Sequence, residues 1–149
     1  MNAFVAAGAG FLLAVLWLDL MFDVQVHAHR DGALPEPVLA SIAAYYARVT
    51  TAARPMNRLI AAVMVATLAA IVVEIVTGTH PRWIGPASLV LALAAIALAG
   101  GRIVPDAVRL GTRRDAVDRQ SALARSIYHG HVFCACAMAG VLAIQLGFG

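Results

Sequence analysis

Four long runs of apolar residues, separated by more polar segments, organise the chain. Each run is close to the length of about 20 residues that a helix needs to cross a bilayer. Lipid offers no partner for open backbone groups, so we predict a transmembrane helix in each run. The sequence therefore predicts an all-α, up-and-down bundle of four transmembrane helices in a single domain over residues 1–149. The predicted spans cover about residues 3–23, 59–77, 83–101 and 128–148.

The two longer connecting segments also carry helical patterns. Pro37 is well placed to start a helix, and residues 38–53 form an apolar stretch that ends at Arg54-Pro55. Residues 105–125 alternate apolar and charged positions, which indicates an amphipathic extension of spans three and four. We expect both segments at the same membrane surface. The first apolar run has no preceding Arg or Lys and no cleavage-site pattern, so we expect it to be retained as a helix.

The composition supports the membrane assignment. Hydrophobic residues make up 62% of the chain and charged residues 13%, against about 45–50% and 25% in soluble domains. The mean hydropathy of +0.83 excludes an ordinary soluble domain, a disordered tail and a nucleic-acid-binding module. Two cysteines form no disulfide framework.

The arginines predict an orientation. All 11 basic residues are Arg, and only Arg82 lies on the side of the short connection between spans two and three. The positive-inside rule makes the other side cytoplasmic, with both termini outside. We therefore predict a multi-pass protein of a bacterial-type inner membrane. Its predicted partners are the lipid bilayer and a second copy or a larger membrane complex, and we expect no nucleic acid.

This topology brings histidines from two distant segments to one membrane face. Imidazole and thiolate groups bind zinc, copper and iron, so this convergence predicts a transition-metal site. The alternative is that these are interfacial histidines and that the cysteine acts as a small apolar side chain. The candidate ligands are His27, His29, His129, His131 and Cys134, with Cys136 and Met138 nearby.

Two aspartates near the end of span one are further candidates. Asp19, Asp23 and His27 are spaced by four residues, so they share one face if the helix continues. Charged groups at this depth are costly in a membrane and are functional candidates. The alternative is a structural ion pair, Asp19 with Arg58 or Asp23 with Arg102.

On span four, His131, Cys134 and Met138 form a stripe that continues to Gln145. We expect this stripe to face Asp19 and Asp23 inside the bundle.

Other polar residues have both structural and functional interpretations. Asn57 either caps the second transmembrane helix, which we favour, or points its amide into a cavity. Tyr45, Tyr46 and Tyr128 fit anchoring at the membrane interface.

At the opposite end of the bundle, we expect Glu74 and Gln145 to share a hydrogen bond. A proton or cation path from Glu74 to Asp19 is the alternative, and the apolar middle of the bundle disfavours it.

Three short motifs resemble the anthrone-oxygenase-like family of small four-helix membrane proteins. They are Pro55-Met56-Asn57 at the start of span two, Val104-Pro105-Asp106 after span three and His131-Val132 in span four. The chain departs from the family pattern at Ala107, where Asn is usual, and at Phe133, near the usual position of an Arg. The resemblance implies a cofactor-independent oxygenase, with His131 as the base and Asn57 as a polar contact.

Three functions follow as hypotheses. The main one is a membrane-embedded oxidoreductase that acts on a lipophilic small molecule, with His131, Asp19, Asp23 and Asn57 as its catalytic residues. The second is a protein that binds copper, iron or zinc through the histidines and Cys134. The third is a non-catalytic subunit of a larger membrane complex, in which the polar residues hold the helices together.

Overall fold

The computed structural model describes residues 2–29, 31–78 and 81–149 as a bundle of helices. Helices account for 88% of the structure, and the described residues contain no strand. Four helices are long and apolar enough to cross a membrane. The predicted fold class is confirmed. The elements are α1 (Asn2–Asp23), η1 (Val24–Ala28), α2 (Glu36–Thr51), α3 (Arg54–Thr77), α4 (Ile84–Leu98), η2 (Ala99–Ile103), α5 (Val104–Thr112) and α6 (Val117–Phe148).

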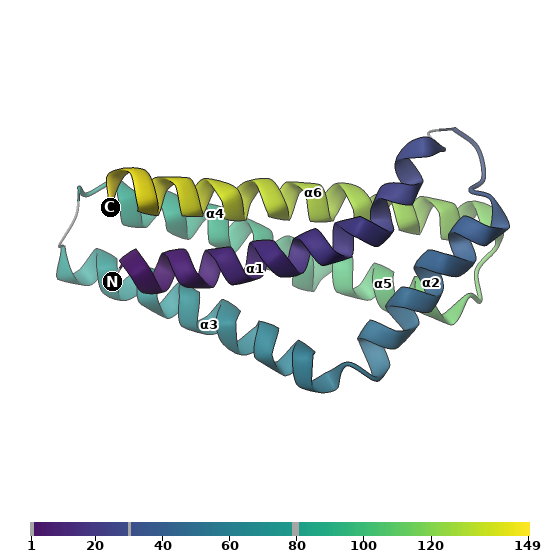
Figure 1. The fold of residues 1–149 in the computed structure, drawn as a ribbon, viewed down its shortest axis with the longest axis horizontal. Coiled ribbons are helices and arrows are strands. Elements are labelled where there is room, and N and C mark those ends of the chain that lie inside the picture. The colour runs from purple at the N-terminus through teal and green to yellow at the C-terminus, as the bar shows by residue number, and fades with distance from the viewer. Residues whose placement is uncertain (1, 30, 79–80) are drawn as a thin grey trace.

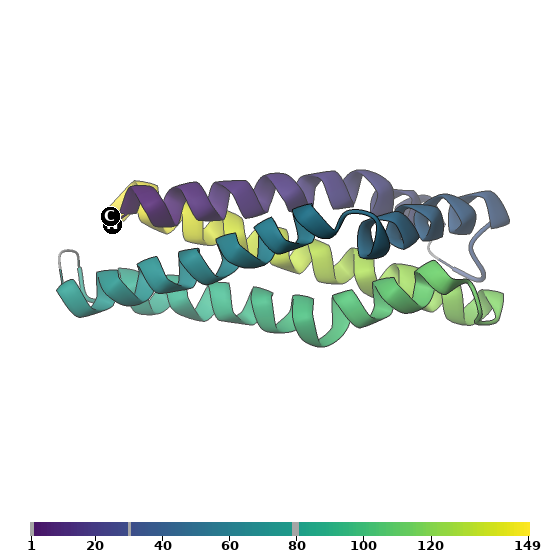
Figure 2. The same ribbon diagram turned by 90° about the horizontal axis from the view of Figure 1, so that it is seen from below.

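The long helices lie side by side and both chain termini are at one end of the bundle (Figures 1 and 2). α6 packs against α1 on one side and against α4 on the other, and α3 joins α1 and α4. α2 packs against α5 at the opposite end. We call this second end the Arg-rich end, and the end that holds both termini the terminal end.

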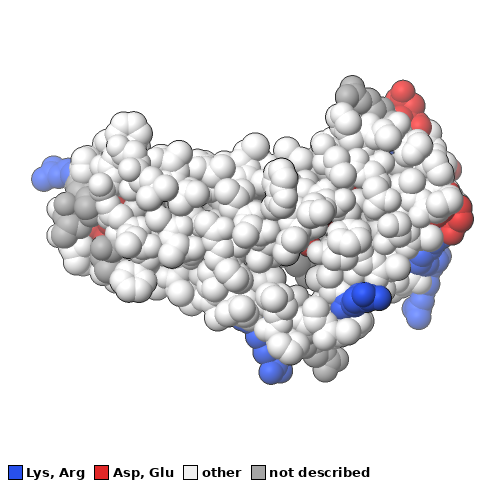
Figure 3. Space-filling view, viewed as in Figure 1, with Lys and Arg blue, Asp and Glu red and all other residues white. Residues whose placement is uncertain are grey.

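The distribution of charge agrees with this geometry. In the space-filling view, the middle of the bundle is almost free of charged residues, and most of the charged side chains gather at the Arg-rich end (Figure 3). Arg30 and the side chain of Arg54, which count toward the arginine bias, lie outside what the structure describes. The uncharged middle is the part that suits the hydrocarbon core of a bilayer.

The amphipathic segment 105–125 extends spans three and four, as predicted. α5 continues α4 through η2, and α6 begins at Val117 instead of near Tyr128. Leu123 and Ile127 are buried along this extension, which explains why it stays helical and packed. Arg113, with a φ of 52°, ends α5 in the left-handed conformation and allows the chain to reverse.

A short π-helical segment, η2, joins α4 to α5 and contains Gly100 and Gly101. Pro105 has no backbone N–H to donate to the carbonyl of Gly101, four residues earlier. The N–H of Val104 instead bonds the carbonyl of Ala99, five residues back. Such π segments widen a helix locally and often lie at functional sites.

A close approach of backbones fixes α2 against α5. A Cβ atom built on Gly111 would lie 3.0 Å from the backbone nitrogen of Ala47. Only glycine permits this contact without a shift of one helix. α2 is thereby held over the Arg-rich end, where its two tyrosines face α1.

Candidate functional site

A buried hydrogen-bond network joins three helices at the Arg-rich end. The Asp23 side chain on α1 is fully buried. Its Oδ1 accepts a hydrogen bond of 2.6 Å from the Tyr46 hydroxyl on α2, and its Oδ2 lies 2.6 Å from His131 Nδ1 on α6. Because a carboxylate only accepts, we assign the proton of the neutral imidazole to Nδ1, which leaves Nε2 as an acceptor.

A second pair lies beside the first. Tyr45 donates its hydroxyl to Asp19 Oδ1 over 2.6 Å, and its ring stacks on Phe22 with centroids 4.0 Å apart. The other Asp19 oxygen, Oδ2, lies 3.9 Å from His131 Nε2. This separation is too long for a hydrogen bond. The two atoms therefore face each other without direct contact.

The two tyrosines remain protonated donors. Burial away from water, followed by the Asp23 carboxylate beside it, raises the pKa of Tyr46 above its ordinary value. Burial and the hydrogen bond to Asp19 raise the pKa of Tyr45 in the same way. Both hydroxyls thus keep the protons that they donate to the carboxylates across the neutral pH range.

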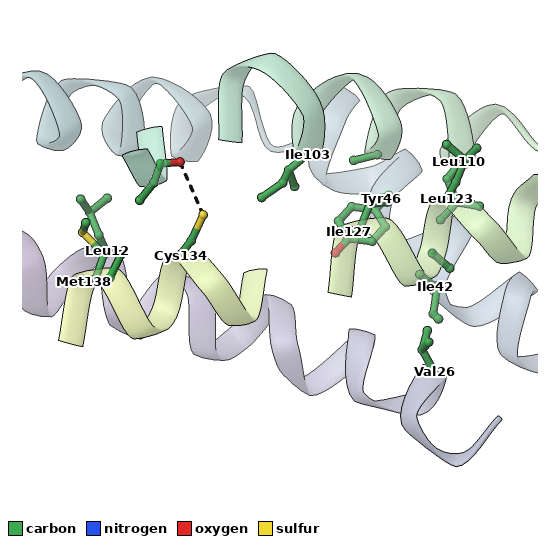
Figure 4. Close-up of a cluster of buried hydrophobic side chains, with 14 of the residues drawn as sticks. Leu12, Val26, Ile42, Tyr46, Ile103, Leu110, Leu123, Ile127, Cys134 and Met138 are labelled. Carbon is green, nitrogen blue, oxygen red and sulfur yellow. Dashed lines mark hydrogen bonds between the residues drawn. The ribbon is translucent and has the colours of Figure 1, made fainter. Parts of the chain in front are cut away.

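The network borders a cavity of about 370 Å³. α1, α2, α3, α6 and the region around η2 contribute its walls. Most of its lining is apolar. Figure 4 shows three of the lining residues, Leu12, Cys134 and Met138, close together. The Cys134 thiol contacts the carbonyl of Ala95 at 3.5 Å. The polar side chains in the lining are Asp19, Tyr46, Thr50, Asn57 and His131, together with the Cys134 thiol.

The two predicted stripes do face each other. Asp19 and Asp23 on α1 meet His131 on α6, and Cys134 and Met138 are buried along the same face of α6. The proposed alternative of aspartate–arginine pairs is wrong, because tyrosine hydroxyls and His131 hold the two carboxylates.

Arg102 bonds Ser126 and lies 4.0 Å from Asp106 instead. Since Asp106 and Ser126 are next to η2 at the surface, Arg102 stays outside the bundle.

The candidate metal ligands do not converge. Among the residues that the structure describes, no three His, Cys, Asp or Glu side chains form a group that could hold a metal ion. α1 ends at Asp23, so His27 and His29 lie in or after the 3-10 turn η1 and leave the face that carries the aspartates. His129 is exposed because it lies two residues from His131 on α6, on another face. The prediction of a copper, iron or zinc site finds no support.

Asn57 does not cap a helix, contrary to the interpretation that we favoured. α3 begins at Arg54, with Pro55 in its first turn, so Asn57 is already inside the helix. Its side-chain amide donates to the carbonyl of Val49 over 2.8 Å and lines the cavity. It therefore connects α3 to the end of α2 at the cavity wall.

The predicted contact between Glu74 and Gln145 is confirmed at the terminal end. Gln145 Nε2 lies 3.4 Å from Glu74 Oε1 and 3.1 Å from Ser88 Oγ. All three side chains are buried. The hydroxyl of Thr67, in the middle of the bundle, donates a hydrogen bond to the carbonyl of Val63 in its own helix.

Sequence reasoning missed the part played by Tyr45 and Tyr46, which we expected to be interfacial anchors. A usable signal was present, because two carboxylates four residues apart on α1 need donors. Two adjacent tyrosines on a helix predicted at the same membrane face can supply them. Tyr128 borders His27 and His129, with ring centroids 6.4 and 5.3 Å away.

The fold and this site define a four-helix membrane protein with a buried Asp–Tyr–His network beside an apolar cavity. Residues 1–148 match the family model of the SHR3 chaperone, described as an ER membrane protein SH3. The chain therefore belongs to this family. No match was found among the curated proteins or among the solved structures.

This membership corrects two sequence-based predictions about the protein's class. The resemblance to anthrone oxygenases is wrong, and so is the main hypothesis of an oxidoreductase, because the chaperone role is non-catalytic. The misleading motifs have a structural explanation. Pro55 and Pro105 lie in the first turns of α3 and α5, where proline suits any helix start.

The predicted location is also wrong. The family is one of ER membrane proteins, and this contradicts the predicted location in a bacterial inner membrane. The arginine bias states which side of a membrane faces the cytosol, and it does not specify which membrane that is.

Proposed function

We propose that this protein is a non-catalytic chaperone of the ER membrane that binds transmembrane segments of other membrane proteins. The match to the chaperone family over residues 1–148 carries this proposal. The hypothesis of a non-catalytic subunit in a membrane complex, stated above as the third alternative, agrees with it. By the arginine bias, the Arg-rich end faces the cytosol.

The exposed faces of the bundle fit such a role. Only 22% of the most apolar 18-residue stretch of α3 is buried inside the protein. Val65, Val72 and Val76 on α3 are 67%, 46% and 79% exposed. These β-branched side chains offer an apolar surface to lipid or to a client helix, and they carry no polar group that a client must satisfy.

The buried network supports a structural contribution to this function. It joins α1, α2 and α6 through hydrogen bonds between side chains that stay out of water. A chaperone that exposes apolar faces needs a frame that keeps its shape when no client is bound. We propose that Asp23, Tyr46 and His131 provide this frame.

Site-specific photo-crosslinking tests the proposal. A photoreactive amino acid replaces Val65, Val72 or Val76 in turn, and Ile71, which is fully buried, serves as the matched control on the same helix. A multi-span membrane protein and, in parallel, a soluble secreted protein are translated in the presence of ER membranes that carry each variant. We expect adducts between exposed α3 positions and the new multi-span protein, and none at Ile71 or with the secreted protein.

Depletion of the chaperone tests the proposal for client proteins that contact a helix other than α3. Without the chaperone, we expect newly made multi-span proteins to aggregate in the ER membrane, and the wild-type chain to restore them. If depletion leaves their assembly unchanged and no exposed position forms an adduct, the proposed function is wrong.

A further inference from the structure

The cavity at the Arg-rich end has the size and the lining of a small-molecule site. Its volume of about 370 Å³ lies within the range of roughly 300–1,000 Å³ that is typical of ligand pockets. Side chains such as Leu12, Met64, Ile103 and Met138 supply an apolar wall. A few polar groups gather at one side of it, around Asp19 and His131. This combination suits an amphiphile with one polar end.

The polar side of the cavity presents unused acceptors. His131 is only 6% exposed, and its Nε2 has no hydrogen-bond partner within the described residues. Asp19 Oδ2 faces Nε2 at 3.9 Å, while Asp19 Oδ1 is used by Tyr45. The Tyr46 hydroxyl already donates its hydrogen bond to Asp23, and the Thr50 hydroxyl already donates to the Tyr46 carbonyl. A donor between Asp19 and His131 would satisfy both free acceptors.

The charge of the site points to a cation. Two carboxylates, Asp19 and Asp23, lie within this cluster, and the lining contains no arginine. Arg58 and Arg102 at this end are exposed. A primary ammonium group offers three donors and a positive charge, so it suits this acceptor pair better than a hydroxyl, which has one donor.

The cavity also has a route from the bilayer. Val104 and Val108 line it and are 53% and 48% exposed, and Ala61 on α3 is exposed as well. A lipophilic molecule can therefore enter sideways between α3 and α5. The π segment η2 lies at this side and contributes Ala99 and Ile103 to the wall.

We propose that this cavity binds a lipophilic primary amine, with its ammonium group between Asp19 Oδ2 and His131 Nε2 and its chain against the apolar wall. The proposal is independent of client binding, because it rests on the interior of the bundle and not on its exposed faces.

Binding of matched amphiphiles tests this site. Radiolabelled n-decylamine is titrated onto the protein in lipid nanodiscs, with empty nanodiscs as the blank, and unlabelled n-decanol and n-decanoate compete. We expect saturable binding of one amine per chain, weak competition by the alcohol and none by the carboxylate. Uptake equal to that of empty nanodiscs, or equally strong competition by the alcohol and the carboxylate, overturns the proposal.

Variants locate the binding to the cavity. Asp19→Asn keeps an oxygen for Tyr45 and removes the charge, and we expect it to weaken amine binding about tenfold or more. Ala61→Phe narrows the cavity from an exposed position that tolerates a larger side chain, and we expect it to reduce binding strongly. Glu74→Gln, at the terminal end, is the matched control and should bind as the wild type does. If Asp19→Asn folds, as judged by its thermal unfolding, and binds the amine normally, the assignment of the head group is wrong.

Discussion

The two ends of the bundle each contain a buried polar cluster, and the clusters differ in construction. At the Arg-rich end, hydrogen bonds of 2.6 Å join charged or aromatic side chains on α1, α2 and α6. At the terminal end, the contacts of Gln145 with Ser88 and Glu74 are 3.1 and 3.4 Å long. Figure 4 shows Tyr46 of the first cluster amid buried apolar side chains, next to Ile127.

The clusters also differ in what surrounds them. The Arg-rich cluster borders a cavity and leaves acceptors on its wall. In the terminal cluster, one oxygen each of Glu74 and Gln145 is buried without a hydrogen-bond partner among the described residues. The comparison teaches that burial of a polar residue in a membrane helix does not by itself mark a site. A site is indicated when free polar atoms face a space that a ligand can fill.

The largest expected effect comes from removal of the acceptor at the centre of the Arg-rich cluster. Asp23→Ala leaves the buried Tyr46 hydroxyl and His131 Nδ1 without their partner. A buried donor that is left without an acceptor costs about 1–3 kcal/mol of unfolding free energy, and this variant leaves two such donors. Unfolding in mixed detergent micelles measures the change, with Asp31→Ala in an exposed turn as the control. A loss below about 1 kcal/mol, the scale of one ordinary hydrogen bond, would mean that the network contributes little.

An intermediate effect on stability is expected from substitution of Gly111, where α5 packs closely against α2. Alanine is favoured over glycine inside a helix by about 0.5–1 kcal/mol. Gly10→Ala on α1, where nothing lies within 4 Å of the new Cβ, should therefore stabilise the protein. Gly111→Ala should destabilise it instead, because its Cβ would press on the Ala47 backbone at 3.0 Å. Thermal unfolding of the two variants shows the sign. The same sign in both would contradict the close approach of α2 and α5.

A smaller effect than that of Asp23→Ala is expected at the terminal end. Gln145→Met removes the hydrogen bonds and keeps a side chain of similar length. Hydrogen bonds between membrane helices average about 0.6 kcal/mol and reach at most about 1.7 kcal/mol. We expect a loss in this range in the same unfolding assay, with the exposed Leu146→Met as the control. A loss as large as that of Asp23→Ala would remove the difference between the two ends.

The sequence was sufficient to predict the helices but not the identity of the hydrogen-bond partners. Apolar run lengths place the spans, and three- and four-residue spacings correctly place Asp19, Asp23, His131 and Cys134 on facing stripes. The position of His27 depends on where α1 ends. No proline or glycine between Asp23 and His27 marks that end in the sequence. The pairing of Tyr46 with Asp23 depended on the tilt of α2, which Gly111 sets through a contact 64 residues away in sequence from Ala47.

The class of the protein was harder still to predict. Short motifs such as Pro55-Met56-Asn57 follow from helix starts in any bundle, so they carry little information about chemistry. The chaperone family is recognised over almost the whole chain, through residues 1–148. Such a match sums many weak preferences that no single residue displays.

Photolabelling of the two ends tests most directly the claim that one end is a receptor and the other a closed structural contact. A diazirine-bearing alkylamine is activated on the protein in nanodiscs, and the labelled residues are mapped by peptide mass spectrometry. We predict labels on cavity residues of α1 and α6, from Leu12 to Asp19 and from His131 to Met138, that excess decylamine removes. Labels around Glu74 and Gln145 that decylamine removes equally well would contradict the account.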